Sequence, residues 1–146
     1  MLLWKKVTIG IGALLLVAGG SALALFAFAL SSSTDGMCAN TVLSEHASPD
    51  GKLKAVVFER SCGATTGFST HVSRIWSHEN LENEGGRLFA ADTNGGRAPA
   101  GTGGGPEVHF KWLSNSTAEL RHHPHIRIFT AKRNSRGIEV VYLTHP

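Results

Sequence analysis

The pattern of apolar and polar residues divides the 146-residue chain into one long apolar run near the N-terminus and a later region of short alternating segments. Residues 7–30, VTIGIGALLLVAGGSALALFAFAL, contain no charged side chain over 24 positions. About 20 helical residues span the hydrocarbon core of a bilayer, so this run predicts one transmembrane helix. Lys5 and Lys6 precede it, and the positive-inside rule then places residues 1–6 in the cytoplasm and the rest of the chain outside.

A cleaved signal peptide is the alternative interpretation of the same run. Ala27-Phe28-Ala29 provides a cleavage site of the A-x-A kind, and cleavage near Ala29 would release a secreted protein. The run is longer than the roughly 7–15 apolar residues of an ordinary signal peptide, which favours an uncleaved anchor. Both interpretations export the remainder of the chain, which we divide into a polar linker at residues 31–37 and a domain at residues 38–146.

Beyond the linker, apolar and polar residues alternate in short segments bounded by turn residues, as is typical of β-strands. Ser48-Pro49-Asp50-Gly51 predicts a tight turn, because proline presets φ and Asp-Gly favours a reversal. The segment that follows it, residues 52–60, is apolar on both sides, which predicts a strand with both faces covered. We expect further strands at residues 68–76, 87–91, 107–113, 117–121, 126–130 and 138–143.

Glycine and proline concentrate in residues 92–106, DTNGGRAPAGTGGGP, which predict a mobile loop. No apolar period of 3.6 residues persists over three turns outside residues 7–30, so no second helix is expected. The exported part therefore predicts an all-β domain, a small antiparallel sandwich or rolled sheet of about six or seven strands.

Charge and cysteine content narrow the possible partners and the compartment. Of the 14 Lys and Arg residues, two precede the apolar run, which leaves 12 basic residues against 11 acidic ones. The exported part thus carries a net charge of about +1 without a basic run, and we expect no nucleic-acid partner. Cys38 and Cys62 both belong to that part, and an even pair outside the cytoplasm predicts a disulfide, with two free thiols as the alternative.

The segment 62–67, CGATTG, admits two interpretations. In the first, its glycine backbone and the neighbouring hydroxyl groups form a small polar cradle that holds an anion or a carboxylate. In the second, which we favour, it is a hairpin loop stapled by Cys62, and the hydroxyl groups bond to the backbone of the turn. A disulfide would also exclude Cys62 as a nucleophile. The candidate ligand-binding residues of the first interpretation are Arg60, Thr65, Thr66, Ser69 and His71.

Other motifs give no firm case for catalysis, metals or cofactors. His123 and His125 would share one face of an extended chain, but a zinc site needs three or four ligands and no HExxH or paired-cysteine motif supplies them. The glycine-rich loop matches neither GxxxxGK[ST] nor a GxGxxG that opens a helix. We therefore expect no metal, no cofactor and no identifiable catalytic residue, and leave open whether the protein is an enzyme.

Several segments of the exported part resemble a family of small bacterial membrane-anchored envelope proteins of unknown function. Proteins of that family carry a cysteine ahead of SPDGK, a CGATTGFST-like stretch, GGGPEV and a W-L-x-x-x-T hairpin. The resemblance covers nearly all of residues 38–130, and it implies a bacterial origin and an envelope location but no activity. The matching segments here are Cys38, Ser48–Lys52, Cys62–Thr70, Gly103–Val108, and Trp112-Leu113 with Thr117.

Together these observations predict a single-pass protein of the bacterial cytoplasmic membrane. Residues 7–30 would contact the membrane, and the β domain would lie in the periplasm or outside the cell as an interaction or structural module. Two alternatives stay open: a small-ligand-binding protein or enzyme that uses the CGATTG loop, and an immunity-like or accessory protein that caps an envelope partner.

Overall fold

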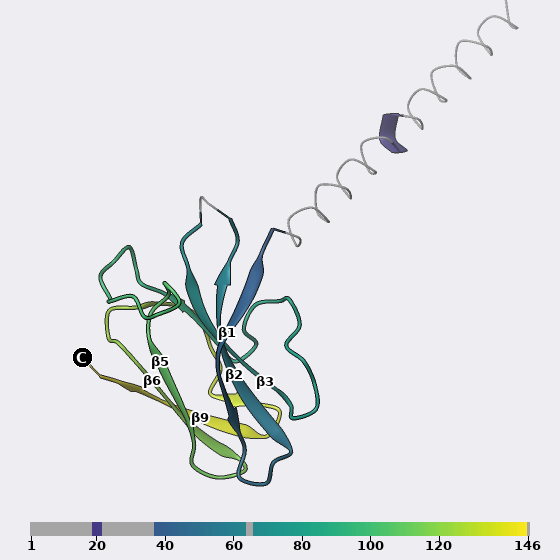
Figure 1. Cartoon of the computed structure of the whole chain (residues 1–146), viewed down its shortest axis with the longest axis vertical. Coiled ribbons are helices and arrows are strands. Elements are labelled where there is room, and N and C mark those ends of the chain that lie inside the picture. Colours follow the sequence, from purple (N-terminus) through teal and green to yellow (C-terminus); the bar gives the residue numbers. More distant parts are fainter. Residues whose placement is uncertain (1–18, 22–36, 64–65, 146) are drawn as a thin grey trace, which may run out of the picture. The chain divides into compact units, whose positions relative to one another are not determined.

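The computed structural model describes residues 19–21, 37–63 and 66–145, and all of the strands found there lie between Ala39 and Thr144 (Figure 1). Gly19–Ser21 are helical. The remainder of the predicted membrane segment and residues 31–36 of the linker lie outside the described residues. Within the described ranges, no helix has the length and hydropathy needed to cross a membrane. The prediction of a transmembrane segment at residues 7–30 therefore stays a prediction.

One layer of the fold is a five-stranded antiparallel sheet with the strand order β1-β2-β3-β4-β7. The predicted turn at residues 48–51 joins its first two strands, with the Gly51 N–H donating to the Ser48 carbonyl oxygen at 2.9 Å and Gly51 at φ 69°. The strands of this sheet are β1 (Ala39–Ala47), β2 (Leu53–Ser61), β3 (Ser69–Trp76), β4 (Phe89–Asp92) and β7 (Arg127–Ala131).

The second layer is a four-stranded sheet with the order β5-β6-β9-β8. Its β6 and β9 run parallel, which corrects the expectation of a wholly antiparallel domain. The reason is the chain path: after β6 the chain crosses to the other sheet to form β7, and it re-enters through β8 in the direction that makes β9 parallel to β6. The strands are β5 (Val108–Trp112), β6 (Thr117–His122), β8 (Asn134–Ser135) and β9 (Ile138–Thr144).

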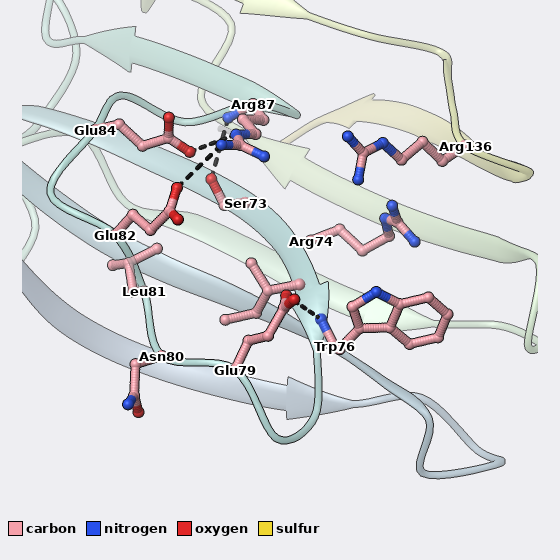
Figure 2. Close-up of a pocket in the computed structure, with 11 residues that line it drawn as sticks. Ser73, Arg74, Trp76, Glu79, Asn80, Leu81, Glu82, Glu84, Arg87 and Arg136 are labelled. Atoms are coloured by element: carbon pink, nitrogen blue, oxygen red, sulfur yellow. Dashed lines mark hydrogen bonds and ion pairs between the residues drawn. The ribbon is translucent and has the colours of Figure 1, made fainter.

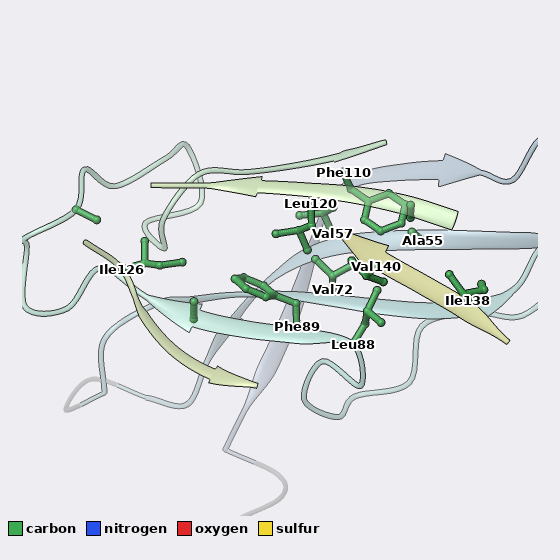
Figure 3. Packing of buried hydrophobic residues seen from close by; sticks show 13 residues of the cluster. Ala55, Val57, Val72, Leu88, Phe89, Phe110, Leu120, Ile126, Ile138 and Val140 are labelled. Carbon is green, nitrogen blue, oxygen red and sulfur yellow. The ribbon is translucent and has the colours of Figure 1, made fainter. Parts of the chain in front are cut away.

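A single hydrophobic core lies between the two sheets (Figure 3), which confirms the all-β prediction and gives it two layers. Val57 and Val72 contribute from the first sheet, and Leu120 and Val140 contribute from the second. The complete cluster is Ala55, Val57, Val72, Leu88, Phe89, Ala91, Ala98, Phe110, Ala118, Leu120, Ile126, Ile138 and Val140.

The opposite face of β2 is also covered, as the sequence pattern of that strand predicts. Val56 and Phe58 point away from the core between the sheets, yet both are fully buried. The segment that joins β3 to β4, residues 77–88, lies against this outer face, because the backbone of Gly86 bonds to His71 and that of Arg87 bonds to Ser73. We call residues 77–88 the β3–β4 segment.

The glycine-rich loop packs against β3. The Thr70 hydroxyl donates to the Pro106 carbonyl oxygen at 2.7 Å, and Gly105 and Pro106 are both buried. A Cβ added at Gly105 would lie 2.5 Å from the Thr70 hydroxyl oxygen, so no side chain fits there. Close approach of the backbone, and not the mobility that the sequence predicts, accounts for this glycine.

Candidate functional site

The CGATTG segment is joined to the start of β1 by a disulfide between Cys38 and Cys62, which confirms the prediction from the cysteine count. The bond extends the β1–β2 ladder by one position, since Ala39 pairs with Ser61 in the register of these strands. Neither sulfur is a free thiol, so Cys62 does not serve as a nucleophile in this state.

Four of the five residues predicted around this loop bond to nearby groups of the protein. The Thr66 hydroxyl donates to the Gly63 carbonyl oxygen at 3.0 Å, within its own turn. The Arg60 guanidinium donates to the side-chain oxygens of Asn40 at 2.7 Å and Asn83 at 3.3 Å. Thr65 lies outside the described residues, so its role in a ligand cradle stays a prediction.

Ser69 and His71 form a hydrogen-bonded pair, with 2.8 Å between the Ser69 Oγ and the His71 Nε2. The Gly86 N–H donates to His71 Nδ1 at 2.8 Å, so Nδ1 carries no proton and Nε2 carries the proton of the neutral ring. His71 thus donates to Ser69, whose hydroxyl in turn donates to the Arg60 carbonyl oxygen at 3.2 Å. A general base for Ser69 would need the opposite tautomer, so this pair is arranged to fasten the backbone.

Burial keeps the His71 ring neutral. The ring is 8% exposed and stacks on Phe58 with 5.4 Å between centroids. Desolvation, reinforced by the positive charge of Arg60, lowers the pKa of His71 to about 4. At neutral pH His71 therefore acts as an uncharged acceptor that holds Gly86, and with it the β3–β4 segment, against the sheet.

A pocket of about 310 Å³ lies at the other end of β3, between the last residues of that strand, the β3–β4 segment and the turn from β8 to β9 (Figure 2). It forms where β3 extends past β4, since β4 pairs only with residues 69–72. We call it the arginine pocket. Its lining residues are Ser73, Arg74, Ile75, Trp76, Glu79, Asn80, Leu81, Glu82, Glu84, Arg87 and Arg136.

Arg74 and Arg136 face each other across this pocket without a carboxylate bound to either (Figure 2). Among the described residues, neither guanidinium forms an ion pair within 4.0 Å, and the buried Nε of Arg74 has no hydrogen-bond partner. Desolvation and then the charge of Arg136 lower the pKa of Arg74, while Glu79 acts in the opposite direction. Two positively charged guanidinium groups thus lie near each other, and the Nε–H donor of Arg74 has no acceptor among the described residues.

Arg136 lies in a strained turn between β8 and β9. Ser135 pairs with Ile138, so Arg136 and Gly137 form a two-residue hairpin turn, with φ of 48° and 82° respectively. Turns of this type favour Asn-Gly, because both central residues adopt positive φ. A non-glycine residue with positive φ is uncommon and costs about 1 kcal/mol or more, and such strain concentrates at functional sites.

The β3–β4 segment gives the pocket an acidic wall. Glu82 and Glu84 both form ion pairs with Arg87, the first at 3.1 Å, so this third arginine is neutralised. The Glu79 carboxylate accepts the backbone N–H of Trp76 at 3.0 Å, and the Trp76 side chain is 48% exposed. Paired guanidinium groups suit carboxylate, phosphate or sulfate, to which each can donate two parallel hydrogen bonds.

Two other features of the described residues lack the unpaired guanidinium groups of the arginine pocket. A cavity of about 630 Å³ lies beneath the glycine-rich loop, where Glu107 and His109 lie 3.5 Å from each other. The His123 and His125 rings lie 5.2 Å apart, but the described part of the chain contains no group of three or more His, Cys, Asp or Glu residues that could hold a metal.

The sequence predictions did not include Arg74, Arg136, Trp76 or Glu79 as site residues. Two signals were present in the sequence. Arg74 is two residues from Val72, so in a strand it points to the same face as that buried residue. Arg136-Gly137 occupies a position where a tight hairpin favours Asn-Gly. Neither signal shows that the two arginines meet, because β3 and the β8–β9 turn are far apart in the chain.

The fold and the pocket together define a two-sheet, disulfide-stapled β domain with a pocket lined by three arginines and three glutamates. Comparisons with protein-family models, with curated proteins and with solved structures find no match to this chain. The geometry of the arginine pocket therefore carries the functional inference.

Proposed function

We propose that this chain is a membrane-anchored bacterial envelope protein whose β domain, residues 38–146, binds an anionic group of a ligand or of an envelope partner protein in the arginine pocket. The observation that carries the proposal is the pair Arg74 and Arg136, which share one pocket while no carboxylate of the residues that the structure describes is bonded to either. Within the described part of the chain, neither residue contributes an ion pair to the fold.

The energetics of the pocket favour a bound anion. A buried donor without a partner costs about 1–3 kcal/mol, and the Nε of Arg74 is such a donor. Neighbouring positive charges add a repulsive contribution, which a carboxylate or phosphate placed between the two guanidinium groups would remove. Interactions that cost folding energy in the free protein and are relieved on binding are typical of functional sites.

The envelope location is supported by the Cys38–Cys62 disulfide and by the charge-free run at residues 7–30. Structural disulfides persist mainly in oxidising compartments. Alkaline phosphatase fused after residue 146 tests the topology in intact bacterial cells, and we expect an active fusion. An inactive fusion, together with an active cytoplasmic reporter at the same position, would contradict the envelope location.

Anion binding can be followed through the fluorescence of Trp76 at the pocket wall. Titration with acetate and with inorganic phosphate should give saturable changes that disappear in Trp76→Phe, which separates this residue from the other two tryptophans. Arg74→Gln and Arg136→Gln should each weaken binding about tenfold, the effect of one charge-assisted hydrogen bond. Arg97→Gln, which removes the same charge from an exposed residue outside the pocket, is the matched control. Equal affinity in all three variants would contradict the proposal.

A further inference from the structure

The arginine pocket carries positive and negative side chains, and among the described residues some of each sign have no ion-pair partner. Three arginines and three glutamates line it. Arg87 forms ion pairs with Glu82 and with Glu84, so these three side chains neutralise one another in part. The remaining charged groups are Arg74 and Arg136 on one side and Glu79 on the other.

Glu79 is positioned as an acceptor for a cation. One of its carboxylate oxygens accepts the Trp76 backbone N–H, and its other oxygen has no hydrogen bond among the described residues. Within the described residues, Glu79 forms no ion pair within 4.0 Å with Arg74 or with Arg136. Its charge nevertheless raises the pKa of Arg74. The Glu79 charge also raises the pKa of Arg87, but no arginine of the pocket lies within ion-pair distance of this carboxylate, so a ligand can still bond to it.

Apolar side chains also line the pocket. Ile75, Trp76 and Leu81 line the same pocket, and Figure 2 shows Trp76 beneath Arg74 with Glu79 beside it. A pocket of about 310 Å³ is at the small end of the range for ligand sites, which suits a compact molecule. The complement of these walls is one short molecule with a carboxylate at one end and an ammonium group at the other.

We propose that the ligand of the arginine pocket is a small zwitterion of the amino-acid or short-peptide class, with its carboxylate on Arg74 and Arg136 and its ammonium group on Glu79. This inference rests on the proposed function, and it adds a second recognition element to the anion site. It also explains why Arg74, Arg136 and Glu79 have no ion-pair partner among the described residues, since each would bind a charged end of the ligand.

A series of blocked dipeptides separates the two charges of the ligand. Glycylglycine carries both charges, N-acetylglycylglycine carries only the carboxylate, and glycylglycinamide carries only the ammonium group. We expect calorimetric titration of the full chain to show glycylglycine binding about tenfold more tightly than either blocked analogue, because each loses a charge-assisted interaction.

Substitution of Glu79 tests the ammonium end separately. Glu79→Gln keeps an oxygen that can accept the Trp76 N–H and removes only the charge, so it should weaken glycylglycine about tenfold. Because the Glu79 carboxylate repels a second carboxylate, the same variant should bind N-acetylglycylglycine as tightly as the wild type does, or more tightly. Glu107→Gln, outside the arginine pocket, is the matched control. Circular dichroism of each variant verifies that the fold is kept.

The possible outcomes distinguish this inference from the proposed function. If N-acetylglycylglycine binds as tightly as glycylglycine, or if Glu79→Gln leaves glycylglycine unchanged, the zwitterion is wrong while an anion site weakened by Arg74→Gln stands. If neither carboxylate-bearing dipeptide binds and acetate and phosphate also fail, both proposals are wrong. A higher affinity for glycylglycinamide than for glycylglycine would overturn the assignment of the carboxylate to the arginines.

Discussion

The CGATTG region and the arginine pocket lie at opposite ends of β3, and they differ in what their polar groups bind. At the start of the strand, Ser69 and His71 are bonded to each other and to backbone groups of the protein. At its end, Arg74 and Arg136 have no bonded carboxylate among the described residues. A cluster of hydroxyl and imidazole groups is therefore weak evidence for a site until its hydrogen bonds are known, whereas charges without partners point to a ligand.

The first region is the scaffold for one wall of the second. The Asn40 side chain, two residues beyond the disulfide, donates to the carbonyl oxygens of Glu82 at 3.0 Å and Glu84 at 2.9 Å. The Asn83 side chain donates to the carbonyl oxygen of Cys38 at 2.8 Å. Together with the bond from Gly86 to His71, these contacts fix the acidic wall of the arginine pocket to the stapled end of the sheet.

Loss of the disulfide should have the largest effect on stability. Cys38→Ser combined with Cys62→Ser removes a crosslink between residues 24 apart, and we expect the free energy of unfolding to fall by about 3 kcal/mol. Urea unfolding followed by circular dichroism measures it. The wild type in the presence of a reductant should behave like the double variant.

The same double variant also tests the link between the two regions. The carbonyl of Cys38 and the side chain of Asn40 hold the β3–β4 segment, so the affinity of the arginine pocket for acetate should fall as well. Unchanged affinity in a destabilised protein would show that the two regions are independent.

Gly86 lies between the two regions and should be the next most sensitive position. A Cβ at this residue would lie 2.3 Å from the Phe89 carbonyl oxygen and 2.9 Å from the His71 Cβ. Gly86→Ala should therefore lower the free energy of unfolding by about 2–3 kcal/mol, as overpacking does. Gly67→Ala is the control, because a Cβ there meets nothing within 4 Å. Equal stability of the two variants would mean that the β3–β4 segment is not held as the structure shows.

Local patterns predicted much of the fold. Both covered faces of β2, the turn at residues 48–51 and the disulfide all follow from alternation, turn chemistry and cysteine count. β1 was not predicted, because ANTVLSEHA is a largely exposed edge strand whose two adjacent apolar residues, Val42 and Leu43, lie at a register shift. β8 consists of only Asn134–Ser135, too short for any periodicity, and the parallel pairing of β6 with β9 depends on the path of the chain through the other sheet.

The candidate site was less predictable for a related reason. The residues proposed around CGATTG are adjacent in the sequence, and proximity in the chain made them visible. The arginine pocket combines the end of β3 with the β8–β9 turn and the β3–β4 segment, so it exists only once two sheets have packed. Whether a polar group has a partner is likewise a property of the folded chain, and a single sequence does not reveal it.

His71 should make stability depend on pH in a defined window. Its pKa is lowered from 6.5 to about 4 in the folded protein, so the unfolded chain takes up a proton first as the pH falls below 6.5. The stabilisation is complete above pH 6.5, and between pH 6.5 and 5 the free energy of unfolding should fall by about 2 kcal/mol from this residue.

His71→Asn isolates that contribution. The amide oxygen can take the place of Nδ1 as an acceptor for the Gly86 N–H, and it does not titrate in this range. The difference in unfolding free energy between wild type and variant, measured by urea unfolding at several pH values, should shrink from pH 6.5 to 5. His46, whose pKa burial also lowers, is present in both proteins and cancels. Parallel pH profiles would contradict a neutral, backbone-bonded His71.

Replacement of Arg74 should have the smallest effect on stability and the opposite sign. Arg74→Met keeps most of the apolar stem but removes a buried donor without a partner and a charge near Arg136, so we expect the free energy of unfolding to stay constant or rise by about 0.5 kcal/mol. Arg87→Met is the matched control: it breaks ion pairs with Glu82 and Glu84 and should lower stability. Urea unfolding with both variants at one ionic strength decides the matter. If Arg74→Met proves the more destabilising of the two, then Arg74 supports the fold, and the contrast between a satisfied and an unsatisfied end of β3 no longer identifies the ligand site.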